Sequence, residues 1–68
     1  MYDGITVDRR VMGGVPCIDS TRIPVATVIG LLGHGREISE VLAEYPTLTK
    51  EDILASLRFA ARAVNERE

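Results

Sequence analysis

The spacing of apolar residues changes along the chain near Pro24. Before Pro24, short apolar pieces at residues 5–7 and 15–18 have the β-branched character of strands, and glycines and a proline separate them. After Pro24, apolar residues recur at helical spacing. We therefore expect one compact, mainly α domain, with a short N-terminal β arm over residues 1–24 and a three-helix bundle over residues 25–68.

The first helix is predicted to start at Pro24, which suits the first helical position because its missing N–H costs nothing there. Gly33 and Gly35 each offer a left-handed stop. The stripe expected to be buried consists of Val25, Val28, Ile29 and Leu32.

The second helix is predicted to be short. Its apolar positions are Ile38, Val41, Leu42 and Tyr45. Pro46 ends it, because the residue before a proline is disfavoured in the helical region.

The third helix has the strongest local signature. Thr49 is a good N-cap, and Asp52 three residues later completes a capping pattern. No glycine or proline follows, so the helix is expected to reach about Asn65. The expected buried face consists of Ile53, Leu57, Ala60, Ala61 and Val64, with Leu54 beside it. A short helix, a tight turn at residues 46–48 and a longer helix are typical of a helix-turn-helix.

The size of the chain calls for extra stabilisation. A core built from 68 residues rarely supplies more than about 3–5 kcal/mol. Cys17 is the single cysteine and His34 the single histidine, which excludes an internal disulfide and the usual zinc modules. We expect no metal or cofactor and a homodimer, in which the arm supplies contacts between subunits.

Composition excludes several classes of protein. No apolar run approaches the roughly 20 residues of a transmembrane helix, and the N-terminus lacks a signal-peptide layout. A lone thiol without an export signal favours the cytoplasm. The net charge of −2 is not that of an obvious nucleic-acid binder.

Two segments resemble a known family when they are taken together: Thr21-Arg22-Ile23-Pro24-Val25, and Tyr45-Pro46-Thr47-Leu48-Thr49-Lys50-Glu51-Asp52-Ile53. The chain resembles the domain-of-unknown-function family four hundred and thirty-three. That resemblance implies a homeodomain-like helix-turn-helix and a VapB-like type II antitoxin, which neutralises a PIN-like ribonuclease toxin and represses its own operon by binding DNA. The family usually caps the second helix with serine or threonine; Arg36 stands there in this chain, so we expect that helix to fray at its start.

Five cations are candidate DNA contacts: Arg9, Arg10, Lys50, Arg58 and Arg62. The plain alternative for each is a solvated surface, with Arg62 paired to Glu66. At the start of the third helix, where a helix-turn-helix reads bases, two carboxylates follow Lys50 and would repel phosphates.

Glu37, Glu40 and Glu44 are candidate partner-binding residues, because an acidic face complements the basic surface that a ribonuclease needs. Four residues are assigned structural roles: Arg22, Pro24, Thr49 and Asp52. Arg22 is expected to tie Asp19 or loop carbonyls to the first helix.

No catalytic constellation is visible, so we do not expect an enzyme. Cys17 is expected to be a small buried hydrophobe, and His34 to interact with the end of the first helix. Two functions remain open: a dimeric helix-turn-helix antitoxin, and a dimeric protein-interaction module that does not bind DNA.

Overall fold

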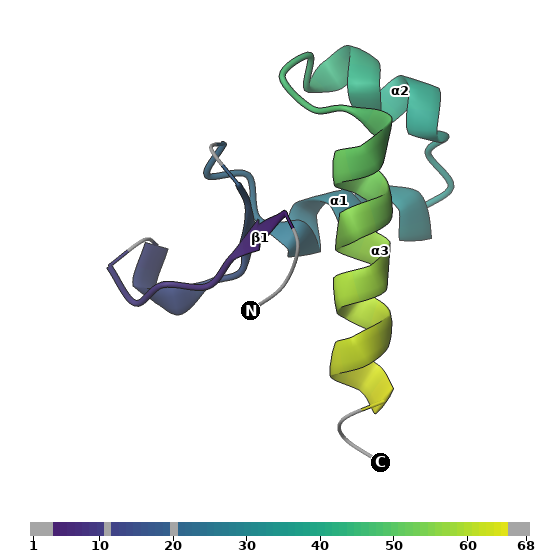
Figure 1. Cartoon of the computed structure of the whole chain (residues 1–68). Helices are drawn as coiled ribbons and strands as arrows, with labels where there is room; N and C mark the ends of the chain where they lie inside the picture. The colour runs from purple at the N-terminus through teal and green to yellow at the C-terminus, as the bar shows by residue number, and fades with distance from the viewer. Residues whose placement is uncertain (1–3, 11, 20, 66–68) are drawn as a thin grey trace.

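The computed structural model describes residues 4–10, 12–19 and 21–65. In chain order the elements are β1 (Ile5–Thr6), the 3-10 turn η1 (Met12–Gly14), β2 (Cys17–Ile18), α1 (Val25–Gly33), α2 (Ile38–Glu44) and α3 (Lys50–Asn65). Three helices with a small antiparallel hairpin confirm the expected fold class (Figure 1).

The hairpin is tied both to itself and to the start of α1. Ile5 lies opposite Ile18 and Thr6 opposite Cys17 in the β1–β2 ladder. On the other side of β2, the backbone N–H of Ile18 donates to the carbonyl of Ile23 at 2.9 Å. The strands are shorter than predicted, because the flanking valines of the 5–7 and 15–18 pieces lie outside the ladder.

Helix α1 begins one residue later than expected. Pro24 has φ −65° and ψ 141°, so it is the extended N-cap and not the first helical residue. At the other end Gly33 is still helical, and Gly35, with φ +96°, supplies the left-handed turn. His34 occupies the C-cap, and its Nδ1 lies 2.7 Å from the carbonyl oxygen of Gly30, as the prediction for this residue required. Because a carbonyl only accepts, the imidazole donates from Nδ1.

Helix α2 is capped, contrary to the expectation of a frayed start. Its N-cap is Glu37 and not Arg36, and the Glu40 carboxylate accepts a hydrogen bond from the Glu37 backbone N–H at 2.8 Å. This is the return half of a capping box. Arg36 instead donates to Glu44 at 3.0 Å and bridges the two ends of the helix.

The start of α3 has the predicted cap, formed by Thr49 and Asp52. The Thr49 N–H donates to Asp52 Oδ2 at 2.9 Å, and the Asp52 N–H donates to Thr49 Oγ1 at 3.1 Å. Two N–H groups that the helix cannot satisfy are therefore paired. The helix ends at Asn65, as expected.

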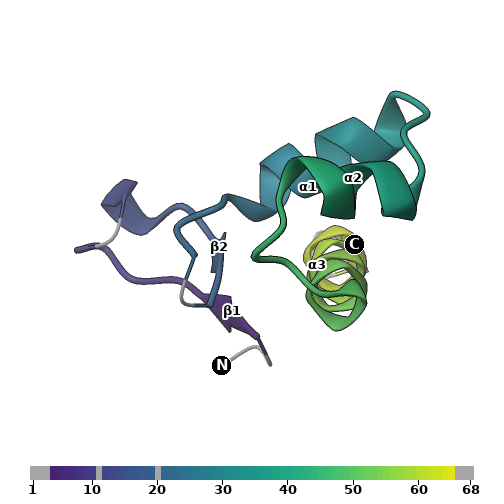
Figure 2. The same cartoon turned by 90° about the horizontal axis from the view of Figure 1, so that it is seen from above.

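The core joins the hairpin to all three helices. Figure 2 looks along α3 and shows α1 and α2 on one side of it, with the hairpin beside the start of α1. Gly4 brings the chain so close to α3 that a Cβ there would lie 3.4 Å from the Cβ of Ala55. The buried hydrophobic residues are Ile5, Cys17, Ile18, Val25, Val28, Val41, Leu48, Ile53 and Ala55.

The predicted buried face of α3 is only partly right. Ile53 is fully buried, but Leu57 is 39% exposed, Val64 is 60% exposed and Ala61 is exposed. Burial falls instead on Ile53, Ala55 and Ser56 near the start of the helix. Figure 1 shows the cause at the end of the helix: the last turns of α3, in yellow, extend past α1, α2 and the hairpin. Leu57 precedes these turns and is exposed because it lies on the outer side of α3.

Candidate functional site

The candidate cations of α3 are partly committed to other contacts. Arg58 donates to Glu51 Oε2 at 2.6 Å across two turns of the helix. Lys50 and Arg62 are exposed. Asp52, which stands beside them in the first turns, is held by the cap with Thr49. The predicted pairing of Arg62 with Glu66 involves a residue outside the described part of the chain.

The hairpin loop carries the other two cations. The Arg10 backbone N–H donates to Asp8 Oδ1 at 2.8 Å, and its guanidinium lies 3.4 Å from Asp8 Oδ2. These bonds to the ionised carboxylate lower the pKa of Asp8 below 3.8, the backbone bond having the largest effect. Arg9 is exposed beside them.

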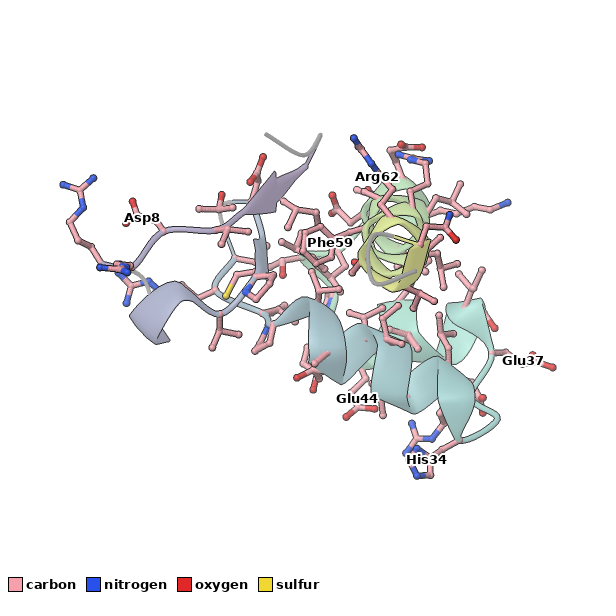
Figure 3. The ribbon with its side chains drawn as sticks, turned by 90° about the horizontal axis from the view of Figure 1, so that it is seen from below. Asp8, His34, Glu37, Glu44, Phe59 and Arg62 are labelled. Atoms are coloured by element: carbon pink, nitrogen blue, oxygen red, sulfur yellow. The ribbon has the colours of Figure 1, made fainter. Side chains whose placement is uncertain are left out.

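The five cations do not gather into one patch. Figure 3 shows Asp8, which marks the position of Arg10, on the hairpin loop well to one side of Arg62 on α3. The loop and the helix are separate projections in Figure 1 as well. A single continuous phosphate-binding surface is therefore not built from these residues within this chain.

The three candidate acidic residues do share one short element. Glu37, Glu40 and Glu44 are all exposed on α2 or at its N-cap. Figure 3 shows Glu37 and Glu44 at the outer side of the fold, away from the hairpin. Glu40 also caps the helix, and Glu44 forms an ion pair with Arg36 at 3.0 Å.

The expected tether from Arg22 to Asp19 is wrong. The carboxylate of Asp19 accepts from the Thr6 hydroxyl, which links β1 to the turn after β2. Arg22 is exposed, with φ +62°, and no hydrogen bond or ion pair joins it to the other described residues. The turn is held instead by Thr21, whose Oγ1 donates to the Ile18 carbonyl at 2.8 Å and accepts from the Ile23 N–H at 2.9 Å.

The remaining polar groups of the interior serve the fold. Cys17 is buried and its Sγ donates to the Val15 carbonyl at 3.3 Å, which agrees with its predicted place in the core. Ser56 is buried and donates to the Asp52 carbonyl at 3.0 Å. Across residues 4–10, 12–19 and 21–65, no three His, Cys, Asp or Glu side chains are grouped to hold a metal ion. No helix in that part of the chain is long and apolar enough to span a bilayer.

Residues 5–60 match the family model described as protein of unknown function (DUF433). The chain belongs to the DUF433 family. It is also similar to the crystal structure of a DUF433 member protein from Anabaena variabilis ATCC 29413, with 35% identity and a TM-score of 0.84. That match covers 93% of this chain and 62% of the other, so this chain spans less than two thirds of the Anabaena protein. No curated protein matches the sequence.

This DUF433 chain also carries a surface that the sequence interpretation missed. Leu54, Leu57, Ala61 and Val64 lie along the outer side of α3, and this set is called the α3 seam below. Leu54 is only half-buried and is not part of the core cluster. The sequence does indicate this surface, because its four residues are spaced by three, four and three positions. The same leucines and valine also fit a helical stripe that faces the core, and they were interpreted that way.

Proposed function

We propose that this DUF433 protein is an antitoxin-like module that binds and neutralises a PIN-like ribonuclease through the outer face of α2. The observation that carries the proposal is the exposure of Glu37, Glu40 and Glu44 on one short helix, with Arg36 as the one cation paired to them among the described residues. The family resemblance supplies the class of partner.

Electrostatic complementarity gives the physical reason. A ribonuclease attracts an anionic RNA backbone, so the surface around its active site carries positive charge. An acidic helix complements that surface, speeds association and, once docked, occupies the path of the RNA.

The test has two parts: whether a gene for a PIN-like ribonuclease adjoins this gene, and whether the purified DUF433 protein inhibits that ribonuclease when it is titrated into an RNA-cleavage assay. We expect stoichiometric inhibition by the natural chain. Changing Glu44→Lys together with Glu40→Gln should weaken inhibition about tenfold or more, since rim charges act on the association rate. Glutamine keeps an oxygen that accepts from the Glu37 N–H, so the cap is retained.

Asp8→Asn is the matched control, because it also removes a carboxylate but lies on the hairpin loop, far from α2 (Figure 3). Inhibition should be unchanged in this variant. Equal inhibition by the natural chain and the α2 variant would remove α2 as the contact, and absence of any inhibition would remove the antitoxin function.

Repression through DNA binding is a second candidate, favoured by the order of a short α2, a turn and a longer α3 with Lys50 exposed at its start. A gel shift of the upstream DNA at two salt concentrations tests it. Each phosphate neutralised contributes a log–log slope of about −0.9, and Lys50→Ala should reduce the slope by about one unit. We rank this function second, because Glu51 and Asp52 adjoin Lys50 and Arg58 is paired to Glu51. An absent shift at low salt would eliminate it.

A further inference from the structure

The α3 seam has the spacing of a coiled coil. Its residues, Leu54, Leu57, Ala61 and Val64, are separated by three, four and three positions, which is the a/d pattern of a helix that pairs with another helix. Leu57 is 39% exposed in the middle of α3, and Val64 is 60% exposed near its end. The last turns of the helix extend past the other elements (Figure 1).

We infer that a second copy of this chain covers the seam, with the two α3 helices packed antiparallel. In this arrangement Leu54 of one copy lies opposite Leu57 of the other, and the same contact is repeated by symmetry. Lys50 then lies over the small Ala61 of the second copy, where its aliphatic stem covers the seam and its ammonium reaches water.

Charge on the flank of the seam favours this occupant and this direction. Glu51 and Arg58 occupy equivalent flanking positions one heptad apart, and such positions face each other across an antiparallel pair. Glu51 of each copy therefore meets Arg58 of the other. A parallel pair would place Arg58 beside Ile53 or Ala60, which offer no charge. Within one chain the two side chains already form an ion pair at 2.6 Å, so the pair exchanges partners on dimerisation.

The interface in such a dimer is small. Only about four turns of α3 take part, so the interface is smaller than the roughly 1,200–2,000 Å² of stable complexes. We expect a reversible dimer in the micromolar range. A dimer of this kind suits a chain of 68 residues with a single cysteine, which cannot form a disulfide within the chain.

The first test is sedimentation equilibrium of the chain alone from about 1 µM to 1 mM. The natural chain should pass from monomer to dimer over that range. Leu57→Glu should stay monomeric, with its helical circular dichroism retained because Leu57 lies outside the core. Ala43→Glu, which places the same charge at an exposed position of α2, should dimerise like the natural chain.

A charge exchange separates contacts between chains from the ion pair within one chain. Glu51→Arg and Arg58→Glu should each weaken dimerisation about tenfold or more. An equimolar mixture of the two variants should form a heterodimer, because opposite charges meet only between unlike chains. A natural chain that is monomeric at 1 mM, a Leu57→Glu variant that still dimerises, or a mixture no better than its components would each overturn the inference. No ribonuclease or DNA is present, so the outcome does not depend on the proposed function.

Discussion

Ile18→Ala tests whether the hairpin is part of the core. Ile18 is 1% exposed, pairs with Ile5 across the ladder and donates its N–H to Ile23. Truncating a fully buried isoleucine costs about 2–5 kcal/mol, which includes the cavity left behind. A single core of this size supplies about 3–5 kcal/mol, so we expect the variant to lose most of its stability.

Urea unfolding followed by circular dichroism at helical wavelengths measures the effect. With a slope near 1 kcal/mol/M for so small a chain, a loss of about 3 kcal/mol moves the midpoint by about 3 M, which leaves little native baseline. Val7→Ala is the matched control on the same hairpin; Val7 is 52% exposed, so its truncation should cost less than about 0.5 kcal/mol.

The circular dichroism signal reports on the helices, although the Ile18→Ala mutation lies in a strand. If Ile18→Ala leaves the helical midpoint where it was, the hairpin is an appendage that folds separately, and the single core described above is wrong. Loss of helix in step with the hairpin supports the core.

Three further predictions concern backbone and charge. Thr49→Ala should lower the free energy of unfolding by about 1 kcal/mol through loss of the cap, and Thr47→Ala, an exposed control in the same turn, by less than about 0.5; equal midpoints in urea would contradict this. Arg10→Ala should raise the pKa of Asp8 toward 3.8 in a carboxyl NMR titration, because the guanidinium stabilises the ionised form. Since the folded pKa of Asp8 is lowered, its contribution to stability is present above pH 3.8 and is lost as the pH falls below it; an unmoved titration would refute the pairing. Gly35→Ala should cost about 1–2 kcal/mol in thermal or urea unfolding, because φ is +96° while the space around it is open; a neutral result would mean that this turn adopts another conformation.

Local signals in the sequence predicted the elements well. Thr49 and Asp52 fixed the start of α3, because a capping box involves atoms only three residues apart and needs no tertiary context. At α2 the same chemistry was present in Glu37 and Glu40 but was overlooked in favour of Arg36. Glutamate is a less usual N-cap than serine, threonine or aspartate, so the signal was weaker there.

Polar contacts between elements were harder to predict from the sequence than the elements themselves. Asp19 bonds to Thr6 because strand register brings them together, and no spacing in the sequence specifies that pairing. The expected tether to Arg22 was plausible by proximity alone. The sequence also does not show that the five candidate cations lie apart in the fold. Two of them are on the hairpin loop and three are on α3 (Figure 1).

The sequence by itself determined the three helices, the cap of α3, the short strands and the lack of an internal disulfide, because these depend on local chemistry and on residue counts. The tertiary structure alone decided which apolar residues of α3 are buried. Ile53 and Val64 lie eleven residues apart on nearly the same side of α3, yet the first is fully buried and the second is 60% exposed. Helical periodicity fixes the direction in which a side chain points, whereas burial requires another element to lie there, and α1, α2 and the hairpin are too short to follow α3 to its end.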